Sequence, residues 1–126
     1  MTRPVVSTAR KGALGEDAAV SYLESKGWKV LARNFRVRVG EIDVIAQQGD
    51  TVAFVEVKSW KSVPREDLAR SIGPRKRSRI ARAARLFLSR RPDLADAHQR
   101  FDVVFLGGAE NGIEHIAGAF NEEGID

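Results

Sequence analysis

Apolar residues near the start of the chain recur with the spacing of one helical face, which predicts a helix over residues 9–26. The positions that carry this repeat are Leu14, Ala18, Ala19, Tyr22 and Leu23. Gly27 follows as a C-terminal stop. Glu16 precedes Val20 by four residues and Leu23 by seven, so it belongs to the edge of the apolar stripe rather than to the wet side.

Apolar runs rich in β-branched residues then predict three strands, over residues 28–34, 41–46 and 51–59. The sequence QQGD between the second and third runs is typical of a tight hairpin turn over residues 47–50. Gly49 can supply any positive φ that this turn requires.

The second half of the chain begins with residues 60–73, which have no clear periodicity. Pro74 suits the first position of a helix over residues 74–90. A strand over residues 100–107 follows, and residues 113–120 form a further short strand or a closing segment. The order α-β-β-β-α-β with this last segment predicts an α/β fold, a mixed sheet flanked by helices.

Three charged residues, Asp43, Glu56 and Lys58, interrupt the apolar strands. Burial of a charge is costly unless the group is paired, hydrogen-bonded or bound to a metal. Glu56 and Lys58 are two residues apart on one strand, so they share a face. If Ala46 pairs with Thr51 across the turn, Asp43 lies on the face of Glu56, one diagonal step away at roughly 7–8 Å between backbones.

Two carboxylates at that separation can converge on one divalent cation. Mg²⁺ prefers carboxylate oxygens and water, and usually takes one or two protein carboxylates together with phosphate oxygens. Such an ion lowers the pKa of bound water and stabilises charge on a phosphate, with Mn²⁺ as a substitute. Lys58 would then add electrostatic stabilisation of the transition state. Glu16 would supply another carboxylate, directly or through water.

The same residues also have a structural explanation. Asp43, Glu56 and Lys58 could form a cross-strand ion pair on a wet sheet face, where such pairs contribute only about 0–1 kcal/mol. Glu16 could simply complement the dipole at the start of its helix. Spacing alone leaves both explanations open.

The composition bounds the class of protein. A chain of 126 residues, 43% hydrophobic and 30% charged, fits one globular domain. We expect this domain over residues 9–120, with flexible tails at 1–8 and 121–126. The sequence has no cysteine, which excludes disulfides and thiolate metal sites. No apolar run approaches the roughly 20 residues of a membrane span, so we expect a cytoplasmic protein without a membrane partner.

The net charge of +4 and the pI near 9.8 favour a polyanionic partner, most often nucleic acid. Basic residues cluster between Pro74 and Arg91, without acidic partners at helical spacing. Lys76 precedes Ile80 by four residues, so it belongs to the apolar face and could point toward the carboxylates. The residues expected to contact nucleic acid are Arg36, Arg38, Lys61, Arg75, Lys76, Arg79 and Arg82. A merely solvated basic helix is the alternative.

The segments GEIDVI and FVEVK together resemble the signature of PD-(D/E)XK nucleases, with Asp43 as the acidic residue and Glu56-Val57-Lys58 as the (D/E)XK part. Most of the chain is similar to the YraN-like family of small bacterial proteins, which resemble Holliday-junction resolvases. The resemblance implies a restriction-endonuclease-like fold. It also implies Glu16, Asp43 and Glu56 as metal ligands and Lys58 as the catalytic lysine. A homodimer would suit a substrate with two strands to cut.

The leading hypothesis is a Mg²⁺-dependent endonuclease that hydrolyses DNA phosphodiesters, at branched or junction structures. No base-reading motif is visible, so the phosphate backbone is the expected target. A second hypothesis is a non-catalytic nucleic-acid-binding module that keeps the nuclease scaffold. A third is a protein-interaction subunit whose basic helix meets an acidic partner.

Overall fold

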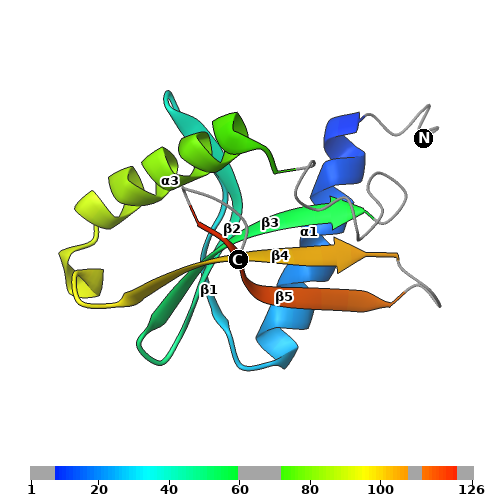
Figure 1. Ribbon diagram of the computed structural model, residues 1–126. Coiled ribbons are helices and arrows are strands. Elements are labelled where there is room, and N and C mark those ends of the chain that lie inside the picture. Colours follow the sequence, from blue (N-terminus) through cyan, green and yellow to red (C-terminus); the bar gives the residue numbers. More distant parts are fainter. Residues whose placement is uncertain (1–7, 60–71, 108–111, 122–126) are drawn as a thin grey trace, which may run out of the picture.

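Five strands form one sheet whose order follows the chain, β1-β2-β3-β4-β5 (Figure 1). The computed structural model describes residues 8–59, 72–107 and 112–121. The strands are β1 (Lys29–Val37), β2 (Gly40–Gln48), β3 (Thr51–Ser59), β4 (His98–Leu106) and β5 (Ile113–Phe120). The helices are α1 (Thr8–Ser25), α3 (Pro74–Ser89) and the short 3-10 helix η2 (Pro92–Leu94).

The sheet is mixed, because β3 and β4 run parallel while every other neighbouring pair is antiparallel. A parallel pair needs a long crossover, and the chain between β3 and β4 contains α3. Together with the two α-helices the sheet makes an α/β fold, consistent with a restriction-endonuclease-like core. The expected order of elements is confirmed, and residues 113–120 form a full strand.

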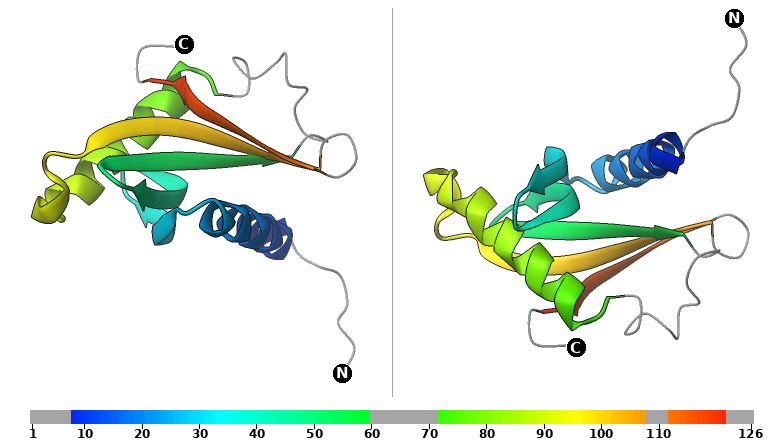
Figure 2. Two further views of the ribbon diagram at one scale, coloured as in Figure 1. Left: turned by 90° about the horizontal axis from the view of Figure 1, so that it is seen from below. Right: turned by 90° about the horizontal axis from the view of Figure 1, so that it is seen from above.

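The two α-helices cover opposite faces of the sheet (Figure 2). Ala19 and Leu23 of α1 pack on the face formed by Val44, Val55 and Val104. Both helical residues are fully buried, as the apolar stripe predicts. None of the helices in the described part of the chain is long and apolar enough to cross a membrane.

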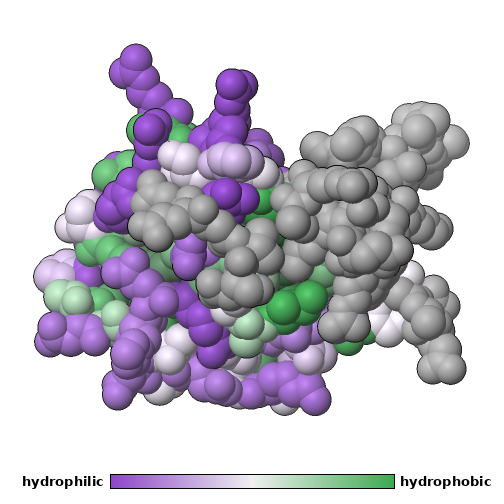
Figure 3. Space-filling view, in the orientation of Figure 1, coloured by the Kyte–Doolittle hydropathy of each residue, from purple (hydrophilic) through white to green (hydrophobic). Residues whose placement is uncertain are grey.

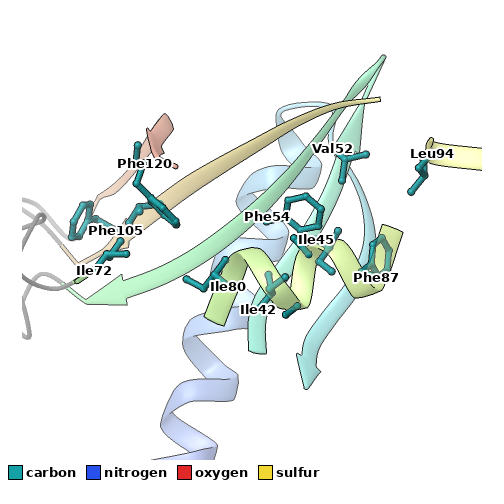
Figure 4. Close-up of a cluster of buried hydrophobic side chains, with 14 residues drawn as sticks. Ile42, Ile45, Val52, Phe54, Ile72, Ile80, Phe87, Leu94, Phe105 and Phe120 are labelled. Carbon is teal, nitrogen blue, oxygen red and sulfur yellow. The ribbon is translucent and has the colours of Figure 1, made fainter. Parts of the chain in front are cut away.

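Helix α3 packs on the other face through Ile80 and Phe87, against Ile45, Phe54 and Phe105 (Figure 4). The rings of Phe87 and Phe54 meet edge to face, with centroids 6.4 Å apart. Burying a side chain of this size stabilises the fold by about 1.5–3 kcal/mol. This packing holds the middle and the end of α3 against the sheet.

The β2–β3 turn corrects the expected register. Gln48 pairs with Thr51, so Ala46 pairs with Ala53 and not with Thr51. The turn therefore has two central residues, of which the first, Gly49, has a φ of 58°, as in a type II′ hairpin. The correction is a shift of two residues. Because side chains alternate with period two, a shift of two residues leaves Asp43 on the face of Glu56, as the sequence predicted.

The β1–β2 hairpin is longer than expected, since β1 continues past Asn34 to Val37, which pairs with Gly40. Residues 38–39 form the tip. Gly40 is buried, and a Cβ at this position would collide with the carbonyl oxygen of Arg79 in α3. The hairpin therefore rests directly on the backbone of α3.

A polar cluster joins β4 to β5 around Asp102, which is fully buried. Its carboxylate accepts two hydrogen bonds of 2.9 Å from Arg100, one of 2.9 Å from the Gly118 amide, and lies 2.7 Å from Nε2 of His115. Burial would raise the pKa of Asp102, but His115, Arg100 and the Gly118 amide hold it below its ordinary value. Asp102 thus connects Arg100, two residues earlier on β4, with His115 and Gly118 of β5.

Candidate active site

A pocket of about 640 Å³ lies where the first turn of α3 approaches β2 and β3. Its lining residues are Glu41, Asp43, Glu56, Val57, Gly73, Pro74, Arg75, Lys76, Arg79 and Ile80. Two of the expected metal ligands, Asp43 and Glu56, thus face one cavity together with three basic residues of α3. A concave site with convergent charged groups is the usual form of an active or binding site.

Asp43 lies where β2 separates from β3. The ladder between these strands ends at the pair Val44–Val55. Beyond it, the Val57 amide donates a 2.8 Å hydrogen bond to Oδ2 of Asp43 instead of to the β2 backbone. The Asp43 carboxylate therefore replaces a backbone carbonyl as the hydrogen-bond acceptor of the Val57 amide where the strands separate. The strand register holds Asp43 next to Glu56.

Glu56 is the buried acidic centre of the pocket, with 8% of its side chain exposed. Two ammonium groups contact the same oxygen, Oε2 of Glu56. Nζ of Lys76, from α3, lies 2.5 Å away, and Nζ of Lys58, from β3, lies 3.3 Å away. Lys76 thus points inward from α3, as its place on the apolar face predicted. Lys58 contacts Glu56 but is not among the residues that line the pocket.

The crowding of charges perturbs the pKa values of the site. Burial and the negative charge of Glu56 raise the pKa of Asp43 to about 7, against the opposing Val57 amide. Burial and the neighbouring Lys76 lower the pKa of Lys58. For Lys76, burial acts to lower the pKa, but the Glu56 carboxylate outweighs it and raises the pKa. Shifts in opposite directions within one pocket are typical of functional sites.

Glu16, the third expected ligand, is not brought into the pocket. It projects from α1, on the other face of the sheet from α3, and Oε1 lies 3.9 Å from the guanidinium of Arg33. Burial raises the pKa of Glu16, and its charge in turn raises the pKa of Asp43. Glu16 is therefore an electrostatic neighbour of Asp43 rather than a wall of the cavity.

The expected nucleic-acid contacts divide into two groups. Arg75, Lys76 and Arg79 line the pocket. The exposed residues Arg36, Arg38 and Arg82 lie outside it, on the β1–β2 hairpin and further along α3. Lys61, which was also expected to bind nucleic acid, and its neighbour Trp60 lie outside the described residues.

The pocket also contains one acidic residue that was not expected, Glu41. Its carboxylate lies 3.0 Å from Nε of Arg36 across the hairpin. Glu41 precedes Asp43 by two residues on β2, and side chains at that spacing share a face of a strand. The two-residue spacing of Glu41 and Asp43 is visible in the sequence. The point at which β2 separates from β3 is not.

The donor set suits a hard divalent cation, although no group of three or more His, Asp or Glu side chains that could hold a metal ion occurs within residues 8–59, 72–107 and 112–121. Asp43 and Glu56 offer carboxylate oxygens, and Mg²⁺ usually takes only one or two protein carboxylates. Burial and the charge of Glu56 raise the pKa of Asp43, so an ionised Asp43 is unfavourable here without a nearby positive charge. A cation would supply that charge.

The family model described as "Uncharacterised protein family UPF0102" matches residues 15–106, which include both pocket strands and α3. A UPF0102 protein of Rhodopseudomonas palustris is 41% identical over 116 residues, or 92% of this chain and 87% of the relative. One of Syntrophus aciditrophicus is 44% identical over 113 residues, 88% of each chain. One of Clostridioides difficile is 38% identical over 115 residues, 91% of this chain and 100% of the relative. The chain therefore belongs to the UPF0102 (YraN-like) family.

Proposed function

We propose that this protein is a Mg²⁺-dependent endonuclease that hydrolyses DNA phosphodiesters. The observation that carries the proposal is the convergence of Asp43 and Glu56 in one pocket, with Lys58 and Lys76 on the same oxygen of Glu56. The pattern of these residues along the chain resembles the PD-(D/E)XK signature. The resemblance of the YraN-like family to Holliday-junction resolvases makes branched DNA the proposed substrate.

Asp43 and Glu56 would hold the cation, which is Mg²⁺ with Mn²⁺ as a substitute. When bound, the cation supplies positive charge against the phosphate and lowers the pKa of water. Glu16 is a proposed outer partner that acts through water, because its charge reaches Asp43 although its side chain does not line the pocket.

The basic residues at the site have two different proposed roles. Lys58 is half-buried beside a second ammonium group, and its lowered pKa makes it the better proton donor of the two lysines. It would stabilise the charge that develops on the phosphate. Lys76, Arg75 and Arg79 face the cavity and would bind the phosphate before the reaction.

One observation favours a second function, a nucleic-acid-binding module without turnover. Lys76 and Lys58 already balance the charge of Glu56, at 2.5 Å and 3.3 Å. A site neutralised by its own lysines binds a phosphate without any metal. Such a module would bind DNA equally well in EDTA and would never cut it.

The test incubates the purified protein with four-way junction, flap, single-stranded and linear duplex DNA, in Mg²⁺, in Mn²⁺ and in EDTA. Glu56→Gln and Lys58→Met are assayed beside the natural protein, and Glu24→Gln, an exposed glutamate of α1, is the matched control. The proposal expects cutting that needs metal, prefers the junction, survives Glu24→Gln and is lost in both Glu56→Gln and Lys58→Met.

Two results decide against it. Cutting that persists in Glu56→Gln shows a contaminating nuclease and removes the catalytic assignment. Tight binding in EDTA with no cutting in either metal establishes the non-catalytic module instead.

A further inference from the structure

The exposed side of α3 carries three arginines in one row. Arg75, Arg79 and Arg82 are all exposed, and their spacing of four and three residues places them within an arc of about 60° around the helix. The row starts at the pocket, which Arg75 and Arg79 line, and continues past it to Arg82. It extends for about 10.5 Å along the helix axis.

The β1–β2 hairpin, which contacts α3, carries two more exposed arginines. Arg36 has 68% of its side chain exposed, and Arg38 lies exposed at the hairpin tip. The close approach of Gly40 to the backbone of Arg79 leaves no space between hairpin and helix. Phe35 and Val37 of the hairpin pack toward α3, so the intervening Arg36 points to the other face of β1, where its charge also acts on Glu16 of α1. We therefore call only the row of Arg75, Arg79 and Arg82 on α3 the arginine face.

Among the described residues, the acidic side chains that share the pocket with Arg75 and Arg79 are Glu41, Asp43 and Glu56, and Glu56 is already paired with two lysines. Helix α3 contains no acidic residue, and Glu41 on the hairpin is paired with Arg36 at 3.0 Å. Within the described residues, no acidic side chain pairs with Arg75, Arg79 or Arg82. Hydrophilic residues dominate the edge of the molecule where α3 and the hairpin tip lie (Figure 3). A row of three exposed arginines that no described carboxylate pairs with is complementary to a polyanion.

We propose that the arginine face binds the phosphate backbone of double-stranded DNA next to the bond in the pocket. The identification of the anion as DNA rests on the proposed function. The length of the row, about 10.5 Å, equals the axial length of about three phosphates of one strand of a duplex, at ~3.4 Å each.

A duplex fits this surface better than a single strand does. Proteins hold single strands by stacking bases on exposed aromatic rings. Among the described residues, the only large hydrophobic side chain that is exposed is Val39, and it is not aromatic. Phe35, the aromatic residue of the hairpin, is turned inward, with its ring 5.4 Å from that of Phe87. The arginine face offers positive charge but no aromatic ring on which bases could stack. It therefore favours the regular phosphate backbone of a duplex over a single strand.

The test measures binding by fluorescence anisotropy in EDTA, where metal-dependent cutting cannot occur, with a labelled duplex and its single strand across about 50 to 200 mM salt. Arg79→Ala/Arg82→Ala should lower the slope of log K against log salt by about 1.8, or ~0.9 per lost phosphate contact. Lys26→Ala/Lys29→Ala removes two exposed lysines that lie off the arginine face and should leave the slope unchanged. Circular dichroism establishes that both variants fold.

Equal loss of slope in the two double variants, or binding of the single strand as tight as that of the duplex, would overturn the proposal. Its failure is distinct from failure of the endonuclease. A protein that never cuts DNA but shows the expected slopes keeps the arginine face and loses the enzyme. A protein that cuts DNA but shows no effect of the arginine variants keeps the enzyme and loses the arginine face.

Discussion

At the scale of single residues, the pocket depends on two carboxylates that are costly for the fold on their own. Asp43 is held by the Val57 amide, and Glu56 is held by Lys58 and Lys76. Buried charges of one sign next to each other destabilise a protein unless a partner compensates them. Here Glu56 has its partners within the protein, whereas Asp43 keeps a pKa of about 7. Asp43 is therefore the residue whose charge most needs a cation.

The metal-free protein should lose stability as the pH rises through about 7, because the folded state holds the Asp43 proton more tightly than the unfolded chain does. Asp43→Asn keeps an acceptor for the Val57 amide without the charge. We expect Asp43→Asn to raise the melting temperature at pH 8 in EDTA, by about 2–8 °C for each kcal/mol of folding stability that removal of the charge restores. Mg²⁺ should stabilise the natural protein and not the variant. A lower melting temperature for Asp43→Asn in EDTA would contradict this account.

The two lysines on Glu56 should have separable effects. Lys58→Met should lower kcat by about 100-fold or more, the usual effect of losing a group that stabilises transition-state charge. Lys76→Met, which removes a cation from the cavity wall, should mainly raise KM. Steady-state kinetics on a junction substrate measures both constants. The reverse assignment, with kcat falling only in Lys76→Met, would move the catalytic role to α3.

At the scale of elements, the site arises because two strands separate under the end of a helix. β2 leaves β3 at Asp43, and α3 brings its first turn over the opening. The packing of Ile80 on the sheet holds that turn in place. The hairpin β1–β2 closes the other side, because Gly40 rests on the backbone of α3. Loss of either contact should open the pocket without touching a charged residue.

Gly40→Ala tests the contact between hairpin and helix. Its Cβ would collide with the Arg79 carbonyl oxygen, so we expect destabilisation of about 1–3 kcal/mol and weaker DNA binding. Gly15→Ala is the control, because in α1 the added Cβ would meet Leu106 at an ordinary 3.4 Å and should stabilise the helix by about 0.5–1 kcal/mol. Urea unfolding and anisotropy measure the two effects. Unchanged stability in Gly40→Ala would show that the hairpin is not held against α3.

Asp102 tests the junction of β4 and β5. Asp102→Asn should cost about 1.5–3 kcal/mol at pH 7, because the buried carboxylate and its two charge-assisted hydrogen bonds from the partly exposed Arg100 are lost. Since the folded-state pKa lies below the ordinary value of 3.8, the stability from Asp102 is present above that value and is lost as the pH falls through the folded pKa. Asp93→Asn, which removes an exposed partner of Arg91, should change little. Acid unfolding that is identical in the natural protein and in Asp102→Asn would contradict this.

At the scale of the whole molecule, the charged residues are sorted by face. The arginine face and the pocket lie on the α3 side of the sheet, while Asp102 and His115 belong to a structural cluster beside Trp28, whose ring lies 6.2 Å from that of His115. Within the described residues, the exposed arginines of α3 would orient the protein as it approaches a polyanion. One face can therefore both bind a substrate and present it to the pocket.

The sequence predicted the order of elements because each has a clear apolar period, and it predicted that Asp43 and Glu56 share a face because alternation survives a register shift of two. It did not place Glu16 relative to the pocket, because a helical pattern does not say which face of a sheet the helix will cover. It missed the Asp102–His115 contact for a similar reason, since only the pairing of β4 with β5 brings these residues together.

The most direct test of the central claim, that Asp43 and Glu56 share a divalent cation, is a titration of the metal-free protein with Mn²⁺ followed by electron paramagnetic resonance. We expect one ion per chain at the pocket, displaced by excess Mg²⁺. Asp43→Asn and Glu56→Gln should each abolish binding, while Asp93→Asn, which removes an exposed carboxylate far from the pocket, should bind as the natural protein does. Equal binding by Glu56→Gln, or no binding by the natural protein, would contradict the account.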